Sequence, residues 1–281
     1  MKITKAVIAV AGYGTRFLPA TKAVPKELFP IVNVPILELL VKELSNAGIK
    51  DILIVINKNK ESIKKNFTKN QILENLISND SLLLALAQTY KTYAKIHYAY
   101  QKKPNGFADA VSYARKFVGD DDFILCVGDE VFYGEKTLTE QLIECYEKYL
   151  TPCMAVFPVL EKESSLYGMV SFTKSEDCLK VNQIIEKPKV NPPSNLANIG
   201  RYVLPPTIFD VIDSMYVKGC ETNFVECLNY LLNERELIAV NAQGYRFDTG
   251  NKVGFIKANI YASLQDENIK DEILEFIKGF Q

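Results

Sequence analysis

Short apolar segments alternate with longer segments of helical periodicity through the first 160 residues, and this alternation restricts the chain to few folds. The apolar runs predict strands at 5–11, 51–57, 95–101, 122–132 and 152–159. Apolar residues spaced three and four apart predict helices at 35–48, 60–67, 70–94, 106–119 and 138–150. Strands and helices that alternate in this way form βαβ units. We therefore expect an α/β fold with a Rossmann-like sheet, mixed but mainly parallel, flanked by helices.

The last 120 residues are less regular. Their patterns predict strands at 167–173, 179–188 and 237–250, a loop that enters a strand at 192–204, helices at 205–216 and 223–234, and closing helices within 255–277. The chain has no long Pro-, Gly- or Ser-rich linker and no internal repeat. We therefore expect a single α/β domain, residues 1–281, with the later elements folded onto the first.

Charge and special residues exclude several classes of protein. The 33 basic and 34 acidic residues give a net charge of -1, so we expect neither nucleic acid nor a membrane as partner. The N-terminal apolar run ends after six residues, too short for a signal peptide or a membrane span. Six scattered cysteines without a CxxC pair fit a cytoplasmic protein. The only histidine, His97, lies in a strand-like pattern, which argues against a Ser-His or Cys-His hydrolase.

The segment after the first predicted strand has the composition of a phosphate-binding loop. Gly12 and Gly14 allow backbone amides to approach an oxyanion, and Arg16, Lys22 and Lys26 add positive charge. The segment is not a P-loop, because G-x-x-x-x-G-K-[ST] is absent, and it departs from the dinucleotide fingerprint G-x-G-x-x-G/A at its last position. In open parallel sheets such a loop lines the ligand crevice at the carboxyl ends of the strands. The pattern therefore favours binding of a polyphosphate.

The whole string GYGTRFLPATKAVPKE, Gly12–Glu27, closely resembles the signature of bacterial UTP–glucose-1-phosphate uridylyltransferases, which are sugar nucleotidyltransferases. The resemblance continues in family order along nearly the whole chain, in YGMV at 167–170, IIEKPK at 184–189, PSNLANIGRYVL at 193–204 and FDTGNKVGF at 247–255. It implies a nucleotide-binding half at about 1–160, a sugar-binding half at about 161–255 and a C-terminal helical segment at 256–281.

The resemblance also implies the reaction. A phosphate oxygen of glucose 1-phosphate attacks the α-phosphorus of UTP, UDP-glucose forms and pyrophosphate leaves. The nucleophile is already an anion, so no protein base is required, and the protein supplies alignment and charge neutralisation. The cofactor implied is Mg²⁺, which binds one or two carboxylates together with phosphate oxygens. A homodimer or homotetramer is the assembly that the resemblance implies.

Each implied site residue matches a position of the family pattern. The metal-binding carboxylates are Asp129 and Asp248. The catalytic cations are Arg16, Lys26 and Lys187. The residues implied to bind substrate, among which Gln101 reads the uracil edge and Glu186 the glucose hydroxyls, are Ala11, Gly12, Gly14, Lys22, Gln101, Gly106, Gly168, Glu186, Asn195 and Gly200.

Two segments depart from the family pattern and leave substrate choice open. The family commonly has KGLGDA or KGLGHA where this chain has NGFADA, so that Ala108 replaces a glycine. Residues 219–226 differ at Cys220, Asn223 and Glu226 from a segment that borders the sugar. The alternatives are thymidylyl transfer, another hexose 1-phosphate, or a non-catalytic sugar-nucleotide sensor. A nicotinamide oxidoreductase is disfavoured by Phe17, which ends the glycine motif, and by Asn57, which replaces the ribose-binding acid.

Overall fold

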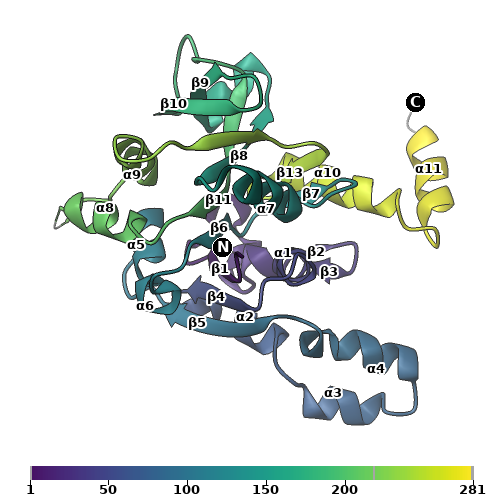
Figure 1. Ribbon diagram of the computed structural model, residues 1–281. Coiled ribbons are helices and arrows are strands. Elements are labelled where there is room, and N and C mark those ends of the chain that lie inside the picture. The colour runs from purple at the N-terminus through teal and green to yellow at the C-terminus, as the bar shows by residue number, and fades with distance from the viewer. Residues whose placement is uncertain (1, 218, 280–281) are drawn as a thin grey trace.

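The computed structural model describes residues 2–217 and 219–279. Within them, nine strands form one sheet in the order β5-β4-β1-β6-β11-β8-β12-β10-β9 (Figure 1). The strands are β1 (Lys5–Ala9), β4 (Asp51–Ile56), β5 (Lys95–Tyr100), β6 (Phe123–Val127), β8 (Cys153–Pro158), β9 (Gly168–Lys174), β10 (Leu179–Glu186), β11 (Leu196–Leu204) and β12 (Ile238–Asn241).

The sheet is mixed and mainly parallel, as the sequence predicts. Strands β5, β4, β1 and β6 pair in parallel, and β8 pairs in parallel with β12. Both β11 and β10 are antiparallel to their neighbours, so of the described strands in this sheet only these two run against the others. The sheet is continuous across residue 160, because β6 pairs with β11. The division of the chain at about 160 and 255 stays a prediction.

Helices cover both faces of the sheet because alternate strand residues face opposite sides. In β1, Val7 and Ala9 belong to one apolar cluster and Ala6 and Ile8 to another. The first cluster is covered by α5 (Gly106–Ser112), α6 (Arg115–Val118), α8 (Ile208–Ser214) and α9 (Phe224–Leu231). The second is covered by α1 (Ile36–Asn46), α2 (Glu61–Asn66) and α7 (Leu138–Tyr149).

The predicted strand at 122–132 is in fact two strands in two sheets. Strand β6 ends at Val127, and after Gly128 and Asp129 the chain continues as β7 (Glu130–Tyr133). Strand β7 pairs with β13 (Tyr245–Asp248) in a separate two-stranded sheet, which packs with α10 (Lys252–Ser263). The prediction of one strand was wrong because the apolar pattern does not register the break at Gly128–Asp129. The predicted strand at 237–250 divides in the same way, into β12 and β13.

Two predicted helices are also divided. The segment 70–94 forms α3 (Gln71–Leu76) and α4 (Ser81–Ala87), because the Asp80 carboxylate accepts hydrogen bonds from the first amides of α4 and begins a new helix. The segment 106–119 forms α5 and α6. The remaining elements are α11 (Lys270–Lys278), the strands β2 (Pro30–Ile31) and β3 (Val34–Pro35), and the 3₁₀ turns η1 (Thr15–Phe17), η2 (Ala20–Lys22), η3 (Lys26–Leu28), η4 (Lys58–Lys60), η5 (Thr89–Lys91) and η6 (Glu161–Leu166).

The carboxyl ends of the four parallel strands β5, β4, β1 and β6 lie at one edge of the sheet. The glycine loop follows β1 there, Gln101 follows β5 and Asp129 follows β6. His97 lies inside β5, with its ring 2.8 Å from an Asp51 carboxylate oxygen and packed against Phe117. The interpretation of His97 as a strand residue is confirmed.

Candidate active site

Two adjoining cavities lie at the carboxyl edge of the parallel strands. The large cavity, about 580 Å³, lies between this edge and the ends of β9, β10 and β11. The small cavity, about 370 Å³, lies over the end of β1, beside Gln101 and the start of α5. The side chains of Phe107, Val127, Asp129 and Glu221 line both cavities. Two ligands, one in each cavity, would therefore lie next to each other.

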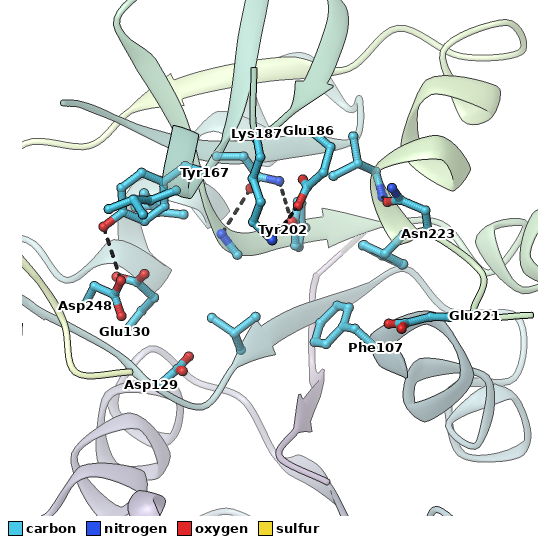
Figure 2. A pocket seen from close by; sticks show the side chains of 18 of the residues that line it. Phe107, Asp129, Glu130, Tyr167, Glu186, Lys187, Tyr202, Glu221, Asn223 and Asp248 are labelled. Atoms are coloured by element: carbon cyan, nitrogen blue, oxygen red, sulfur yellow. Dashed lines mark hydrogen bonds and ion pairs between the residues drawn. The ribbon is translucent and has the colours of Figure 1, made fainter. Parts of the chain in front are cut away.

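Most of the predicted site residues line these cavities, although they come from distant parts of the chain. The large cavity is lined by Arg16, Gly168, Glu186, Lys187, Gly200 and Asp248. The small cavity is lined by Ala11, Gly12, Lys26, Gln101 and Gly106. Asp129 lies where the two meet. Figure 2 shows Asp129 and Asp248 at one end of the large cavity, Glu221 and Asn223 at the other, and Glu186 and Lys187 between them.

Three predicted binding residues, Lys22, Gly14 and Asn195, do not line either cavity, and their contact with substrate stays a prediction. Lys22 is exposed in η2. Gly14 adopts a left-handed conformation, φ +66°, and its carbonyl accepts a hydrogen bond from Thr21 Oγ1 at 2.9 Å, so its role is to fold the loop. Asn195 is exposed, whereas Asn198 lines the large cavity. Asn195 lies in a bend just before β11, whereas Asn198 lies within that strand.

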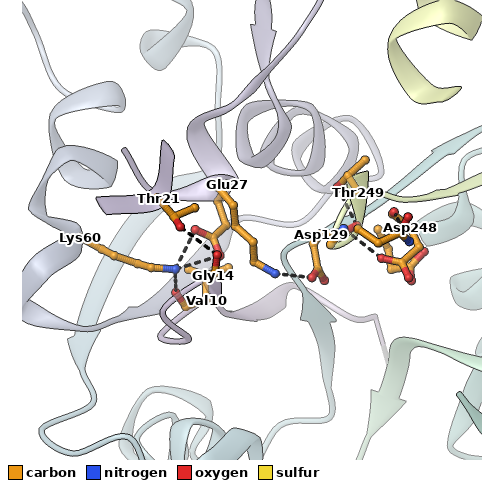
Figure 3. Close-up of polar contacts among 12 residues, drawn as sticks. Val10, Gly14, Thr21, Glu27, Lys60, Asp129, Asp248 and Thr249 are labelled. Carbon is orange, nitrogen blue, oxygen red and sulfur yellow. Dashed lines mark hydrogen bonds and ion pairs between the residues drawn. The ribbon is translucent and has the colours of Figure 1, made fainter. Parts of the chain in front are cut away.

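The carboxylates of Asp129 and Asp248 converge although 119 positions separate them in the chain. Strand pairing sets Asp248 opposite Glu130, next to Asp129. Thr249 clamps the junction, because both its backbone N–H and its hydroxyl donate to the Asp129 carbonyl, at 2.8 and 2.7 Å (Figure 3). A Cβ built on Gly250 would lie 2.4 Å from Asp129 Oδ2 and 2.9 Å from Asp248 Oδ1. Both oxygens thus approach one small space, which glycine leaves open.

Lys26 lies beside this carboxylate pair. Its ammonium is 2.5 Å from Asp129 Oδ2. Burial alone would lower the pKa of Lys26, but neighbouring carboxylates, Asp129 first among them, raise it above its ordinary value. Burial alone would raise the pKa of Asp129, but Lys26 holds it below its ordinary value. Both groups therefore stay charged at neutral pH.

Glu130 is next to Asp129 in sequence but is already paired. Its carboxylate accepts hydrogen bonds from Arg246 Nε at 2.8 Å and Nη2 at 2.5 Å, a two-point contact. Burial raises the pKa of Glu130 to about 7, against the opposing effect of Arg246. The Arg246 guanidinium also lies 4.6 Å from the Tyr167 ring, and the Tyr167 hydroxyl donates to Asp248 Oδ2 at 3.2 Å. This group of residues supports Asp248 and occupies Glu130, so that Asp129, which pairs with Lys26, and Asp248 are the carboxylates placed to approach a metal ion.

The glycine loop rests on a buried ion pair. Lys60 Nζ lies 2.9 and 2.7 Å from the two Glu27 carboxylate oxygens and 2.7 Å from the Val10 carbonyl (Figure 3). Only 4% of Lys60 and 2% of Glu27 are exposed. The pair ties the end of β1, the loop and η4 together, and Asn57 adds a 2.6 Å hydrogen bond to the Ala11 carbonyl. Neither Lys60 nor this role of Glu27 was predicted, because the ion pair joins segments 33 residues apart.

Glu186 and Lys187 lie at the end of β10, facing the large cavity. Their side chains form an ion pair of 3.0 Å. Lys187 has φ +44°, a left-handed conformation that is uncommon outside glycine, and its amide donates to the Tyr167 carbonyl at 3.0 Å. Such strain concentrates at functional sites, which supports the expectation for Lys187.

Sequence reasoning missed several residues that line the cavities: Phe107, Tyr167, Asn198, Tyr202 and Glu221. Phe224 contacts both Phe107 and Tyr202 edge to face, with ring centroids 5.1 and 5.7 Å apart. These rings form an apolar wall, which periodicity alone cannot separate from the core. The sequence signal for Tyr167, Asn198 and Tyr202 was that they lie in the segments 167–170 and 193–204, which resemble the family.

The donor set fits a hard divalent cation. Two carboxylates are too few to hold Mg²⁺ alone, and the described residues contain no group of three or more acidic, His or Cys side chains placed for a metal. Mg²⁺ usually takes one or two carboxylates and completes its coordination with substrate phosphates and water. Asp129, which lines both cavities, and Asp248, which lines the large one, match that requirement.

No helix among the described residues has the length and apolar character to cross a membrane.

Comparison with known proteins gives consistent results. The sequence model of the nucleotidyl transferase family matches residues 5–263. The chain is 39% identical to UTP–glucose-1-phosphate uridylyltransferase 1 of Staphylococcus saprophyticus over 284 residues, 99% of each chain. It is 38% identical to the UTP–glucose-1-phosphate uridylyltransferase of Bacillus subtilis over 283 residues, 99% of this chain and 97% of that protein. The UTP-bound UGPase of Acinetobacter baumannii superposes with a TM-score of 0.91 at 31% identity, covering 99% and 100% of the two chains.

Proposed function

The chain belongs to the nucleotidyl transferase family and is a nucleotidyltransferase, and from that premise we propose that it makes UDP-glucose from UTP and glucose 1-phosphate in a magnesium-dependent reaction that releases pyrophosphate. The observation that carries the proposal is the convergence of Asp129, Asp248 and Lys26 where the two cavities meet. Relatives named as UTP–glucose-1-phosphate uridylyltransferases match over nearly their full length. In this proposal the base of UTP binds in the small cavity, its phosphates lie toward the junction with the large cavity, and glucose 1-phosphate binds in the large cavity.

In the proposed reaction, a phosphate oxygen of glucose 1-phosphate forms a bond to the α-phosphorus of UTP, and the bond from that phosphorus to the bridging oxygen of pyrophosphate breaks. The two substrates are anions and repel each other, so cations must hold them in line. Arg16 and Lys26 serve the triphosphate and Lys187 the sugar phosphate. Asp129 and Asp248 would hold Mg²⁺, which when bound neutralises charge developing on the phosphate oxygens. Glu186 accepts hydrogen bonds from glucose hydroxyls.

The backbone and Gln101 suit the uracil base. The amides of Ala11 and Gly12 donate to no acceptor in the described chain, so they are available to uracil oxygens. Thymine presents the same edge, so this side of the site does not separate UTP from dTTP. The chosen test is therefore pyrophosphate release with Mg²⁺, using UTP, dTTP, ATP and GTP, each with glucose 1-phosphate and galactose 1-phosphate. Release fastest with UTP and glucose 1-phosphate supports the proposal, and no release from folded, nucleotide-binding protein contradicts it.

We also propose a homodimer or homotetramer, which the family resemblance implies. Helices α3 and α4 expose several large apolar side chains, with Ile72 83% and Leu76 80% exposed and Leu82 70%. Figure 1 shows this helix pair standing out from the body of the molecule. Contiguous apolar surface of this kind marks interfaces. Light scattering of the native protein and of Leu76→Glu tests the proposal: the native protein should be oligomeric and the variant smaller, whereas a monomeric native protein contradicts it.

A further inference from the structure

Gln101 is a buried side chain with all of its donor capacity in use. It follows β5 directly, and its backbone N–H donates to the Ile56 carbonyl at 2.9 Å. Its side-chain Nε2 donates to the Gly106 carbonyl at 3.0 Å and to Asp109 Oδ2 at 2.7 Å. The two hydrogens of the amide are thereby both occupied. The residue is only 5% exposed, so water does not compete freely for these contacts.

Both partners of Gln101 Nε2 are obligate acceptors, and this fixes the orientation of the amide. A carbonyl and a carboxylate cannot donate, so a flipped amide would turn Oε1 toward two acceptor oxygens. In the described structure Oε1 accepts no hydrogen bond from the chain, although Gln101 lines the small cavity. The free hydrogen-bonding atom that Gln101 offers to a ligand there is thus an acceptor.

The small cavity then has a defined pattern of polar groups. The backbone amides of Ala11 and Gly12 are donors, and Gln101 Oε1 is an acceptor. The Ala11 carbonyl already accepts a hydrogen bond from Asn57 Nδ2 at 2.6 Å, so Gln101 Oε1 is the acceptor without a partner in the described chain. The edge of uracil offers two oxygens and the N3–H between them, which is complementary to this pattern. Cytosine has an unprotonated N3, which would face Gln101 Oε1 without a hydrogen.

Gly106 supplies one of the two acceptors that hold the Gln101 amide. Gly106 has φ +89°, and a Cβ there would lie 2.2 Å from Glu221 Oε1. Residues with a side chain rarely adopt this φ, and the Gly106 carbonyl accepts the hydrogen bond from Gln101 Nε2. Asp109 lies in the first turn of α5, where a carboxylate is favoured by the helix dipole, and it is half-buried. Asp109 is thus fixed by its helix and acts on Gln101 through one hydrogen bond.

We propose that Asp109 is a positioning residue for base selection: by accepting a hydrogen bond from Gln101 Nε2, it holds Gln101 Oε1 toward the base and so favours UTP over CTP. The inference rests on the proposed function, because it assigns the small cavity to the base of the nucleotide. Asp109 itself does not line the small cavity. Without Asp109, only the Gly106 carbonyl opposes a flip of the amide, and a flipped Nε2 can donate to cytosine N3.

The test is a double-variant cycle on the ratio of kcat/KM for UTP to that for CTP, with glucose 1-phosphate as second substrate. Asp109→Ala should lower this ratio about tenfold, the cost of one hydrogen bond that orients a buried amide. In a Gln101→Ala background the same substitution should change the ratio by less than about twofold, because Asp109 then has nothing to orient. A reduction of equal size in both backgrounds overturns the proposal, and so does an equal loss for UTP and CTP.

Three further variants separate positioning from folding. Asp109→Asn retains an oxygen that can accept from Gln101 Nε2 and should keep most of the ratio. Asp109→Ser is too short to reach Gln101 but suits the first turn of a helix, so it should repeat the alanine result if Asp109→Ala is unstable. Asp210→Ala is the matched control: Asp210 lies in the first turn of α8, pairs with Arg115 at 2.7 Å and lines neither cavity. A shift of the ratio in this control equal to that of Asp109→Ala overturns the proposal.

Failure of the proposed function is distinguished by measuring UTP and CTP affinities by calorimetry on the same proteins. If the native protein binds UTP more tightly than CTP but forms no UDP-glucose, the proposed reaction is wrong. The double-variant cycle on Asp109 and Gln101 is then evaluated on the ratio of the dissociation constants for CTP and UTP. If the native protein turns over UTP and the cycle shows no coupling between positions 101 and 109, the proposed function holds and the role of Asp109 is wrong.

Discussion

The small cavity is lined by the ends of parallel strands and supported from beneath by the buried Lys60–Glu27 pair, whereas the large cavity takes Glu186 and Lys187 from the end of β10. In the described structure the Lys187 ammonium pairs only with Glu186, and both side chains are partly exposed. The nucleotide side is therefore held in place before any ligand arrives, while the charged groups of the sugar side are less constrained.

This difference indicates that the two cavities have separate roles in the proposed reaction. The proposed contacts to the base and triphosphate lie at the carboxyl edge of the parallel strands. The proposed sugar contacts come from later segments, which include the departures at 219–226. Asn223 from that stretch lines only the large cavity, whereas Glu221 lines both cavities. The following predictions test how far the two sides are independent.

The largest effect is expected at the junction of the two sides. Asp129→Ala removes a carboxylate that would hold Mg²⁺ and leaves Lys26 without its partner, so kcat/KM should fall by roughly 10³. Pyrophosphate release during a Mg²⁺ titration measures this, and chelation of divalent cations should abolish release by the native protein. Asp121→Asn is the control, because Asp121 is an exposed acid just before β6. Full activity of Asp129→Ala, or of the chelated protein, would rule out the metal role.

A stability effect of similar size is expected beneath the nucleotide side. Lys60→Met leaves the Glu27 carboxylate buried and unpaired, which should cost about 3–5 kcal/mol in the free energy of unfolding. Urea denaturation measures the change. Lys58→Met, two residues away at an exposed position, should cost less than about 0.5 kcal/mol.

Replacing both members of the buried pair sharpens that result. The double variant Glu27→Leu with Lys60→Met should recover most of the loss, because no buried charge remains. If Lys60→Met costs less than 1 kcal/mol (on the scale of an exposed ion pair), the nucleotide side is not held by this pair.

A smaller effect, confined to one side, is expected for Lys187. Lys187→Ala should lower kcat by about 10², because the sugar phosphate and the reacting phosphate lose a cation. UTP affinity, measured by calorimetry, should change less than about twofold, since Lys187 does not line the small cavity. Lys180→Ala on the same strand, whose side chain pairs with Glu236 at the surface, is the control. Equal losses in turnover and UTP affinity would show that the two sides are not independent.

The smallest effect compares two asparagines. Asn198→Ala should raise KM for glucose 1-phosphate about five- to tenfold, because its side chain lines the large cavity and also bonds the Gly200 amide. Asn195→Ala should stay within about twofold of the native value, since Asn195 is exposed outside both cavities. A larger rise in KM for Asn195→Ala than for Asn198→Ala would support the sequence-based prediction that Asn195 binds substrate.

Much of the fold follows from local patterns. The apolar runs at 5–11, 51–57 and 95–101 are the strands β1, β4 and β5, and the amphipathic pattern at 138–150 is α7, because each pattern reflects which residues are buried. The failures occur at single interruptions. Gly128–Asp129 separates two strands, and Asp80 begins a new helix inside what looked like one. Local propensity does not show which sheet a strand will join.

By itself, the sequence determined the α/β class, the glycine loop after the first strand and the family, because these depend on burial patterns and a short, specific string. Only the tertiary structure decided which charges are available. It joined Asp129 to Asp248 through strand pairing, occupied Glu130 with Arg246, placed Asn198 rather than Asn195 in the cavity and set Asp109 against Gln101. The physical reason is that availability depends on what else lies within hydrogen-bond distance, and those partners come from remote parts of the chain.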